Sequence, residues 1–522
     1  MLHNVRSGPT VVLMTPRIAV VGGGPGGLFF ATLVRRHLPT AEVTLFERNQ
    51  ASDAFGFGVV FSDATLRKID AADPVLRNAL SDYGRHWNRI EVWSRDERYG
   101  FSGNGMAAIH RKVLLRMLQE NAVEAGVELR FGEAAPPVGE LASSYDLVVG
   151  ADGTNSVVRD HLGELGHTVE TATAKFIWFG TTHLFDGLTF VHRVSEHGAF
   201  AVHGYPISDE LSTFIVETDE ETWRRAGMDE FDVSQPPGPS DKASQDFLEK
   251  LFAEDIGGAS LVTNNSRWGN FRTRRTQRWY RDNVVLLGDA VHTAHFSVGS
   301  GTKMAMEDAV TLAEQIAAVH RDEQDLESAL SSYQEERAAS VRKIQDAARP
   351  SLAWWERFGF YQRELDPLTF AFHFFSRSIG VAKIAQRDPA LVQQVRESWM
   401  ASHGASPLRS TLDVNGQSTA APQARLIRTP PQGLPRVDAP ADEVSLPDAM
   451  RALPENGGVV IGGSQELPKV LLSEEARLRR GLTTFLVGDY DDDAAETLLL
   501  SGRCDGVVAV PTRRVDGGTD EQ

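Results

Sequence analysis

The sequence predicts an α/β fold with two kinds of sheet. Two apolar runs, 17–21 and 284–287, each lead through a glycine-rich turn into a helical pattern, which is typical of buried parallel strands in nucleotide-binding folds. Between these units, from about residue 176 to residue 264, apolar and polar residues alternate, which favours antiparallel strands. We therefore expect a discontinuous Rossmann-like domain that carries an antiparallel sheet between its two parts.

The first glycine-rich turn follows the pattern of a dinucleotide-binding fingerprint. Gly22 permits the tight turn, Gly24 lets the backbone approach a pyrophosphate, and Gly27 allows the helix to pack closely on the strand. A second strand, 43–46, ends in Glu47, whose carboxylate can accept hydrogen bonds from an adenosine ribose. The cofactor-binding residues predicted in this unit are Gly22, Gly24, Pro25, Gly27, Glu47 and Arg48.

Two later loops each place an acid after a buried strand. Asp152 follows the apolar run 147–151, and Asp289 follows the run 284–287. The loop after Asp289 is rich in glycine and leads into a helical pattern, whose first backbone N–H groups would be available to an anion. The residues predicted to bind the cofactor in these two loops are Asp152, Gly153, Asp289, Gly299, Gly301 and Thr302.

Together, these three motifs resemble the fingerprints of the FAD-dependent aromatic hydroxylases, the single-component flavoprotein monooxygenases, over about residues 17 to 400. The resemblance implies FAD as cofactor, NADH or NADPH as a transient co-substrate, and O2 as oxidant. Oxygen would add at flavin C4a, and the hydroperoxide would hydroxylate an electron-rich ring. It also implies that Arg111 faces the flavin pyrophosphate, and that Gly58 and Val59 pass beside the isoalloxazine ring.

Two positions depart from the common pattern of this family. Most members have a proline four residues after the histidine of the Gly-Asp loop, and an asparagine two residues after its last glycine; this chain has Phe296 and Lys303. The loop, and with it the segment 58–63, resembles the branch that hydroxylates aryl-CoA thioesters, so we expect a CoA-activated aromatic substrate. A related branch acts on indole compounds, which leaves a free aromatic or indole substrate as the alternative.

Two other functional classes are weaker interpretations. A flavin halogenase shares this fold but normally carries a Gly-Trp-x-Trp-x-Ile-Pro segment, which the sequence lacks. A non-catalytic flavoprotein that docks a partner through its tail would not need the intact cofactor motifs. Both are therefore disfavoured.

Three histidines are candidates for acid–base chemistry near the substrate: His203, His292 and His295. Deprotonation of a ring phenol raises its electron density, and histidine suits this task near neutral pH. We favour His295, because the loop after Gly288 should carry it across the reactive face of the flavin. The alternative is that each histidine packs in the core or holds the loop.

An arginine cluster precedes the second strand–loop–helix unit in an otherwise acidic chain. Guanidinium groups suit the phosphates of CoA, because their planar fork matches an oxyanion. The alternative is an exposed strand edge with solvated charges. The cluster comprises Arg272, Arg274, Arg275, Arg278 and Arg281.

The domain organisation follows from changes in pattern along the chain. We expect an N-terminal extension (1–16), the FAD-binding domain (17–175 and 265–330), the substrate-domain sheet (176–264), a C-terminal helical region with a packed aromatic core (331–403), a proline-rich linker (404–448), and a small α/β tail (449–522). The tail resembles the last βαβ unit of an old-yellow-enzyme barrel, but it is too short for a whole barrel.

The composition of the chain limits which binding partners and metal sites are expected. The chain has 522 residues and a formal net charge of −18, which disfavours nucleic acid and anionic membranes as partners. One cysteine, Cys504, excludes an internal disulfide framework and a multi-cysteine metal site, so no metal is expected. No apolar run is long enough to span a bilayer. We expect a cytoplasmic protein that is a monomer or a homodimer.

Overall fold

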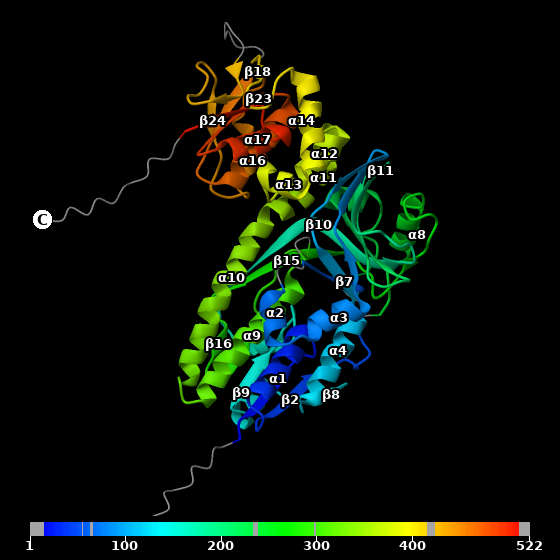
Figure 1. The fold of residues 1–522 in the computed structure, drawn as a ribbon, viewed down its shortest axis with the longest axis vertical. Coiled ribbons are helices and arrows are strands. Elements are labelled where there is room, and N and C mark those ends of the chain that lie inside the picture. Colours follow the sequence, from blue (N-terminus) through cyan, green and yellow to red (C-terminus); the bar gives the residue numbers. More distant parts are fainter. Residues whose placement is uncertain are drawn as a thin grey trace, which may run out of the picture.

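The computed structural model describes residues 15–54, 56–62, 66–232, 238–296, 299–414 and 423–510. Figure 1 shows three regions along the long axis: a parallel sheet with its helices, an antiparallel sheet, and a C-terminal module. Most of the predicted N-terminal extension lies outside the described residues, as do Asp63, Ser297 and the end of the tail (511–522).

The first region is a six-stranded sheet in the order β16-β17-β9-β1-β2-β8. Its central strands are parallel, and β16 is antiparallel at one edge. Val20, Val149 and Val285 lie in adjacent strands with no exposed surface, as expected for parallel strands buried on both faces. Burying each such side chain contributes roughly 1.5–3 kcal/mol. The strands are β1 (Arg17–Val21), β2 (Glu42–Glu47), β8 (Glu128–Phe131), β9 (Leu147–Gly150), β16 (Tyr280–Arg281) and β17 (Val284–Leu286).

Three helices of this region matter for the site. Helix α1 (Pro25–His37) follows the first glycine-rich turn and packs against both α9 (Gly301–His320) and α4 (Arg111–Glu124). Helices α1 and α9 therefore both begin at the carboxyl ends of the parallel strands, where nucleotides bind in open α/β sheets.

The second region is a sheet in the order β14-β10-β13-β12-β11-β5-β6, with β15 also paired with β10. Its pairs are antiparallel except for β11 with β5, which are parallel. The strands are β5 (Ile90–Ser94), β6 (Glu97–Phe101), β10 (His167–Thr181), β11 (Leu188–Ser195), β12 (Gly198–Pro206), β13 (Ser212–Thr218), β14 (Leu261–Val262) and β15 (Gly269–Thr276).

This sheet is larger than the predicted range 176–264. β5, β6 and β15 belong to it, although the sequence interpretation assigns them to the FAD-binding domain. The first half of β10 is mostly exposed and so lacks apolar alternation, and β5 and β6 reach the sheet from a distant part of the chain. Neither feature leaves a local pattern in the sequence.

A small sheet, β3-β7-β4, carries further residues of the site. Gly58, the first residue of β3 (Gly58–Ser62), pairs with His110, the last residue of β7 (Met106–His110). Helix α4 begins at the next residue, Arg111. The third strand is β4 (Arg85–Trp87).

The C-terminal helical region begins with α10 (Leu326–Trp355), which runs along the molecule from the parallel sheet towards the C-terminal module (Figure 1). Its end joins the aromatic core expected from the sequence, in which Trp354, Trp355, Phe358 and Phe370 are buried together. The remaining helices are α11 (Phe358–Glu364), α12 (Pro367–Phe375), α13 (Val381–Arg387) and α14 (Pro389–His403).

The C-terminal module is a parallel sheet in the order β20-β24-β23-β22-β21 with helices α16 (Glu466–Glu474) and α17 (Asp492–Leu500). Two of its strands, β20 (Leu426–Ile427) and β21 (Arg436–Asp438), lie in the range predicted as a linker, so that prediction is wrong for these residues. Both are edge strands, and Pro435 directly precedes β21, where a missing N–H costs no ladder bond. The other strands are β22 (Gly458–Gly462), β23 (Thr483–Gly488) and β24 (Gly506–Ala509).

Among the described residues, no helix combines the length and the apolar character needed to cross a bilayer.

Candidate active site

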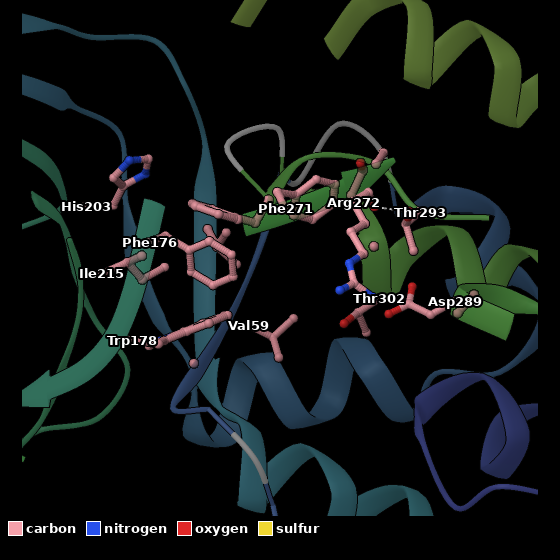
Figure 2. Close-up of a pocket in the computed structure, with 18 of the residues that line it drawn as sticks. Val59, Phe176, Trp178, His203, Ile215, Phe271, Arg272, Asp289, Thr293 and Thr302 are labelled. Atoms are coloured by element: carbon pink, nitrogen blue, oxygen red, sulfur yellow. Dashed lines mark hydrogen bonds between the residues drawn. The ribbon is translucent and has the colours of Figure 1, made fainter. Parts of the chain in front are cut away.

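One large cavity, with a volume of about 990 Å³, lies where the two main sheets meet the C-terminal helices. Its wall includes the first glycine-rich turn, the loop before α9, strands β3, β10, β12, β13 and β15, and the segment that follows α12. Figure 2 shows Asp289 and Thr302 on one side of it, and Trp178, Ile215 and His203 on the other. The cavity therefore joins a nucleotide-type groove to a chamber on the antiparallel sheet.

The glycines of the first turn meet three different steric demands. A Cβ on Gly22, whose φ is +114°, would lie 2.3 Å from the carbonyl oxygen of Ala151. A Cβ on Gly27 would lie 2.2 Å from the carbonyl oxygen of Gly22, so helix and turn can pack only without it. Gly24, in contrast, faces open space within the cavity. Gly24 and Pro25 line the groove, whereas Gly22 lies behind it.

The helices that begin at this groove start without side-chain caps. Gly24 precedes α1 and Ser300 precedes α9, and neither provides a capping hydrogen bond. The hydroxyl of Ser300 is buried without a hydrogen-bond partner among the described residues. Gly153 and Gly301 line the same groove and leave it open, since an added Cβ would meet nothing within 4 Å. Two free helix N-termini and an open glycine-lined groove fit the pyrophosphate and anionic ring of a flavin dinucleotide.

Other predicted cofactor residues lie just behind this groove. Glu47 accepts hydrogen bonds from the N–H of Gly23 (2.8 Å) and of Asn49 (2.9 Å), and thus holds the turn. Asp152 accepts hydrogen bonds from the N–H of Val157 (2.7 Å) and of Val158 (3.2 Å) at the start of helix α6 (Val157–Leu162). Neither carboxylate lines the cavity, and exposed Arg48 does not line it either. Their direct contact with the cofactor stays a prediction.

Arg111 and Asp289 both line the groove, and each affects the pKa of the other. Burial lowers the pKa of Arg111, and the charge of Asp289 opposes this shift. Burial raises the pKa of Asp289, and His292 and Arg111 oppose it. Gly58, Val59, Gly299 and Thr302 complete this part of the wall. Gly58 is confined, because a Cβ there would lie 2.3 Å from a methyl group of Ile207.

His292 does not face the cavity, which corrects its prediction as a catalytic residue. It is 2% exposed, and its Nε2 lies 2.7 Å from Oδ2 of Asp308 on α9. Asp308 also accepts hydrogen bonds from the N–H of Gly288 (3.0 Å) and from Nε of Arg337 (2.8 Å). His292 and Arg337 hold the pKa of Asp308 at about 2 despite its burial. This network anchors the loop after β17 to α9.

His203 does line the cavity, on β12. Its ring centroid lies 4.2 Å from that of Trp355 and 5.5 Å from that of Phe296. Burial lowers its pKa to about 3, with a contribution from the charge of Arg377. His203 is therefore neutral at physiological pH and is a weak base.

The neighbour of His203 is Glu217 on β13, a residue that sequence reasoning missed. Oε1 of Glu217 lies 2.7 Å from Nε2 of His203, but their orientation does not meet the geometry of a hydrogen bond. Burial raises the pKa of Glu217 to about 7, and His295 opposes that rise. An acid at the end of the apolar run 214–216, in a strand that is buried throughout, was the available signal.

His295, the favoured catalytic candidate, lies one layer behind the cavity wall. It is 3% exposed, its ring stacks on Phe296 with centroids 4.4 Å apart, and the ring of Phe271 is T-shaped to it with centroids 5.0 Å apart. Burial lowers its pKa to about 4, with Glu217 opposing. Phe296 lines the cavity instead, so the residue next to His295 presents its side chain to the substrate chamber.

The chamber is mostly apolar and aromatic. Phe296 packs on Phe176 at 5.1 Å and near Trp178 at 6.5 Å, while Ile215 and Val59 face the same space (Figure 2). Such walls fit a planar aromatic ring and exclude water from it.

The basic residues singled out in the sequence separate in the structure. Arg272 and Arg274 line the cavity. Arg275 donates to Oε1 of Gln345 (3.0 Å), and Arg278 and Arg281 are not part of the cavity wall. Lys303 forms an ion pair with Glu307 (2.6 Å) within α9 and does not reach the cavity. The arginine cluster is therefore not one site.

Comparison with known proteins agrees with this geometry. The FAD binding domain family matches residues 139–348. A salicyloyl-CoA 5-hydroxylase from Streptomyces sp is 51% identical over 94% of this chain and 99% of its own length. The chain belongs to the FAD-dependent aromatic monooxygenases. It is therefore a flavoprotein monooxygenase that uses FAD and a nicotinamide nucleotide to hydroxylate an aromatic ring.

Two further comparisons define how much of the chain is shared. A 3-hydroxy-4-methyl-anthranilyl-[aryl-carrier protein] 5-monooxygenase from Streptosporangium sibiricum is 34% identical over 65% of this chain and 89% of its own length. The crystal structure of P. aeruginosa PqsL in complex with 2-aminobenzoylacetate has a TM-score of 0.52 at 24% identity, and covers 66% of this chain and 97% of that one. The α/β architecture is thus that of the aromatic hydroxylases, and each of these two matches leaves about a third of this chain uncovered.

Proposed function

We propose that this monooxygenase hydroxylates the ring of an aryl-CoA thioester such as salicyloyl-CoA, with NADH or NADPH as reductant and O2 as oxidant. The observation that carries the proposal is the 51% identity to a salicyloyl-CoA 5-hydroxylase along almost the entire chain. A cavity that joins the dinucleotide groove to an aromatic chamber supports it, because substrate ring and flavin must meet.

The residues of the groove fit FAD, which would accept a hydride from the nicotinamide nucleotide and activate O2. Gly24, Pro25 and the N-terminus of α1 would hold its pyrophosphate, and Arg111 would contribute positive charge beside it. The N-terminus of α9, at Gly301 and Thr302, would stabilise negative charge on the reduced ring.

His203 and Glu217 would together remove the proton of a ring hydroxyl. His203 lines the chamber and is neutral, so its ring can hydrogen-bond to the ring hydroxyl and pass its proton on, but with a pKa of about 3 it does not keep that proton. Glu217, whose pKa is about 7, lies beside it, and its carboxylate can accept the proton as the phenol ionises. The apolar walls of the chamber strengthen this interaction by excluding water. His295 would act as a positioning residue that supports Phe296.

The experiment is anaerobic mixing of the purified protein with NADH or NADPH while flavin absorbance is followed. We expect bound flavin, and a bleaching rate that rises with salicyloyl-CoA and much less with free salicylate. Equal stimulation by the free acid would reject the thioester, and a preparation without flavin after reconstitution with FAD would reject the enzyme assignment.

The setting of the reaction is also a proposal. We propose a cytoplasmic location, where CoA thioesters and nicotinamide nucleotides are available, and a monomer or homodimer as the functional unit. Size-exclusion chromatography with light scattering distinguishes these two states.

A further inference from the structure

One wall of the cavity comes from the segment that runs from the last turn of α12 to the end of α13. Its apolar part, Phe374 and Phe375, faces the chamber, where Phe374 packs on Phe190 at 4.6 Å. Its polar part contributes two arginines, Arg377 and Arg387, to the same cavity. An apolar interior with basic residues further along the wall fits a ligand that has an aromatic end and an anionic end.

Arg377 is a cation without an acidic partner. Its Nε donates to the hydroxyl of Ser351 (3.0 Å), its Nη1 donates to the carbonyl of Phe374 (2.8 Å), and its guanidinium lies 3.8 Å from the centre of the Phe374 ring. No carboxylate among the described residues forms an ion pair with it. Burial lowers its pKa to about 9, with Arg503 adding to the shift, so Arg377 remains charged at neutral pH. A desolvated cation of this kind favours an anionic or strongly dipolar ligand.

Arg387 is exposed at the end of α13, beside the turn 101–104. Its Nη1 donates to Oδ1 of Asn104 (3.3 Å), and it too has no ion pair among the described residues. Asn104 lines the cavity as well. The N–H of Ser102 donates to Oδ2 of Asp388 (2.8 Å), which ties the turn to this helix end. Arg387 and Asn104 thus mark an opening of the cavity to solvent.

The C-terminal module holds this wall in position. Arg503 donates to the hydroxyl of Ser376 (2.8 Å) and to the carbonyl of His373 (2.7 Å), directly before Arg377. Thr497 and Asp493 of α17 accept hydrogen bonds from the N–H of the first two residues of α13 (2.8 and 2.6 Å). The wall and the module therefore form one unit.

The two relatives differ in how much of this chain they cover, and the difference is about the size of this wall and the module. The aryl-carrier-protein relative matches 65% of this chain, whereas the salicyloyl-CoA relative matches 94%. Their names indicate substrates on different carriers, a protein in one case and CoA in the other. Of these two carriers, CoA is the small molecule, and its phosphates are groups that an enzyme can bind directly. The part of this chain that only the salicyloyl-CoA relative covers is about as long as the C-terminal helices and the module together.

We propose that the opening formed by Arg387 and Asn104 is the exit for the CoA carrier, with Arg387 binding a CoA phosphate and Arg377 binding an oxygen of the acyl group. This inference rests on the proposed aryl-CoA substrate. It assigns the phosphates to the wall braced by the C-terminal module, and not to Arg272 and Arg274 on β15.

The test uses the flavin-loaded enzyme and two substrates, salicyloyl-CoA and the salicyloyl thioester of N-acetylcysteamine, which lacks the phosphates. Arg387→Gln should raise KM for the CoA thioester about tenfold, because one charge-assisted contact is lost, and leave KM for the short thioester and kcat for both within about twofold. Arg377→Gln should raise KM for both thioesters. Arg342→Gln, which changes an exposed arginine of α10 outside the cavity wall, is the matched control and should change neither value.

Three outcomes would overturn the inference: an equal effect of Arg387→Gln on both thioesters, no effect on either, or a selective rise for the CoA thioester in Arg274→Gln instead. Flavin content and melting temperature show whether Arg377→Gln folds, and the Arg387 comparison does not depend on it. Wild-type enzyme that hydroxylates neither thioester would reject the proposed function itself, so the two failures are distinguishable.

Discussion

The dinucleotide groove and the substrate chamber share one cavity but are built from different parts of the chain. The groove is made of backbone, helix N-termini and glycines such as Gly24, Gly153 and Gly301, which lie in the turns and loops between parallel strands and the helices that follow them, or at the first residue of such a helix. The chamber is made of side chains such as Phe176, His203 and Phe374, which come from separate strands and helices. A backbone site has few tolerated sequences, whereas a side-chain chamber can change its ligand by substitution.

Because the groove is built from backbone, substitutions of its glycines should have the largest effects on folding and on flavin binding. Gly22→Ala should prevent folding of the FAD-binding domain, because the new Cβ would lie 2.3 Å from a backbone oxygen at a φ of +114°. Gly24→Ala should fold and yet lose flavin, because its Cβ meets no protein atom but enters the groove. Circular dichroism and flavin content separate the two results. Retention of flavin by both variants would contradict the assignment of the groove.

A second large effect is expected where the loop is anchored to α9. Asp308→Asn should lower the free energy of unfolding by about 3–5 kcal/mol, since it removes the charge of a fully buried carboxylate that pairs with both Arg337 and His292 and leaves Arg337 with Glu307 alone. The pH dependence of turnover in the remaining folded enzyme should not change, because this network does not face the cavity. Asp346→Asn, whose ion pair with Arg275 is on the surface, is the control and should cost less than about 1 kcal/mol. A changed pH profile in Asp308→Asn would return His292 to the list of catalytic candidates.

Beside the chamber, Glu217→Gln should affect the reaction more than the fold. The rate of hydroxylation should fall about 100-fold, and the rise of activity with pH around 7 should disappear, because the titrating group is gone. The pKa of Glu217 is raised on folding, so its stabilising contribution is complete below the unfolded value of 4.5 and is lost as the pH rises to about 7. The melting temperature of the variant relative to wild type should therefore increase between pH 5 and pH 8. If the difference in melting temperature between the variant and wild type stayed constant from pH 5 to pH 8, Glu217 would not titrate in this range.

The smallest effect is expected at the aromatic wall. Phe296→Leu keeps an apolar side chain but loses the stacking on His295 and the contact with Phe176, so KM for the aromatic substrate should rise about threefold to tenfold with little change in flavin binding. Steady-state kinetics measure this. His295→Gln should have a similar effect on KM and leave the pH profile of turnover as in wild type. If this variant lost the rise of activity around pH 7, His295 would be the base instead.

The positions of individual residues show what a local sequence pattern can predict. Gly24, Gly153, Asp289 and Gly301 line the cavity, because a strand–glycine–helix unit dictates its own local geometry, and their contact with FAD stays a prediction. His292 and Lys303 stand in the same informative loop and helix, but they face away from the cavity. The direction of a side chain in an irregular loop depends on what packs against it, and that is not written in the neighbouring residues.

The sequence by itself determined the α/β fold, the FAD cofactor and the aromatic hydroxylase class, since these depend on short segments whose backbone geometry is local. Only the tertiary structure decided that His203 and Glu217 are adjacent, that the range predicted as a linker contributes strands β20 and β21, and that Arg377 and Arg387 reach the cavity under the support of the C-terminal module. These contacts join residues that are far apart in the chain, and their energies come from burial and charge pairing, which exist only once the chain has folded.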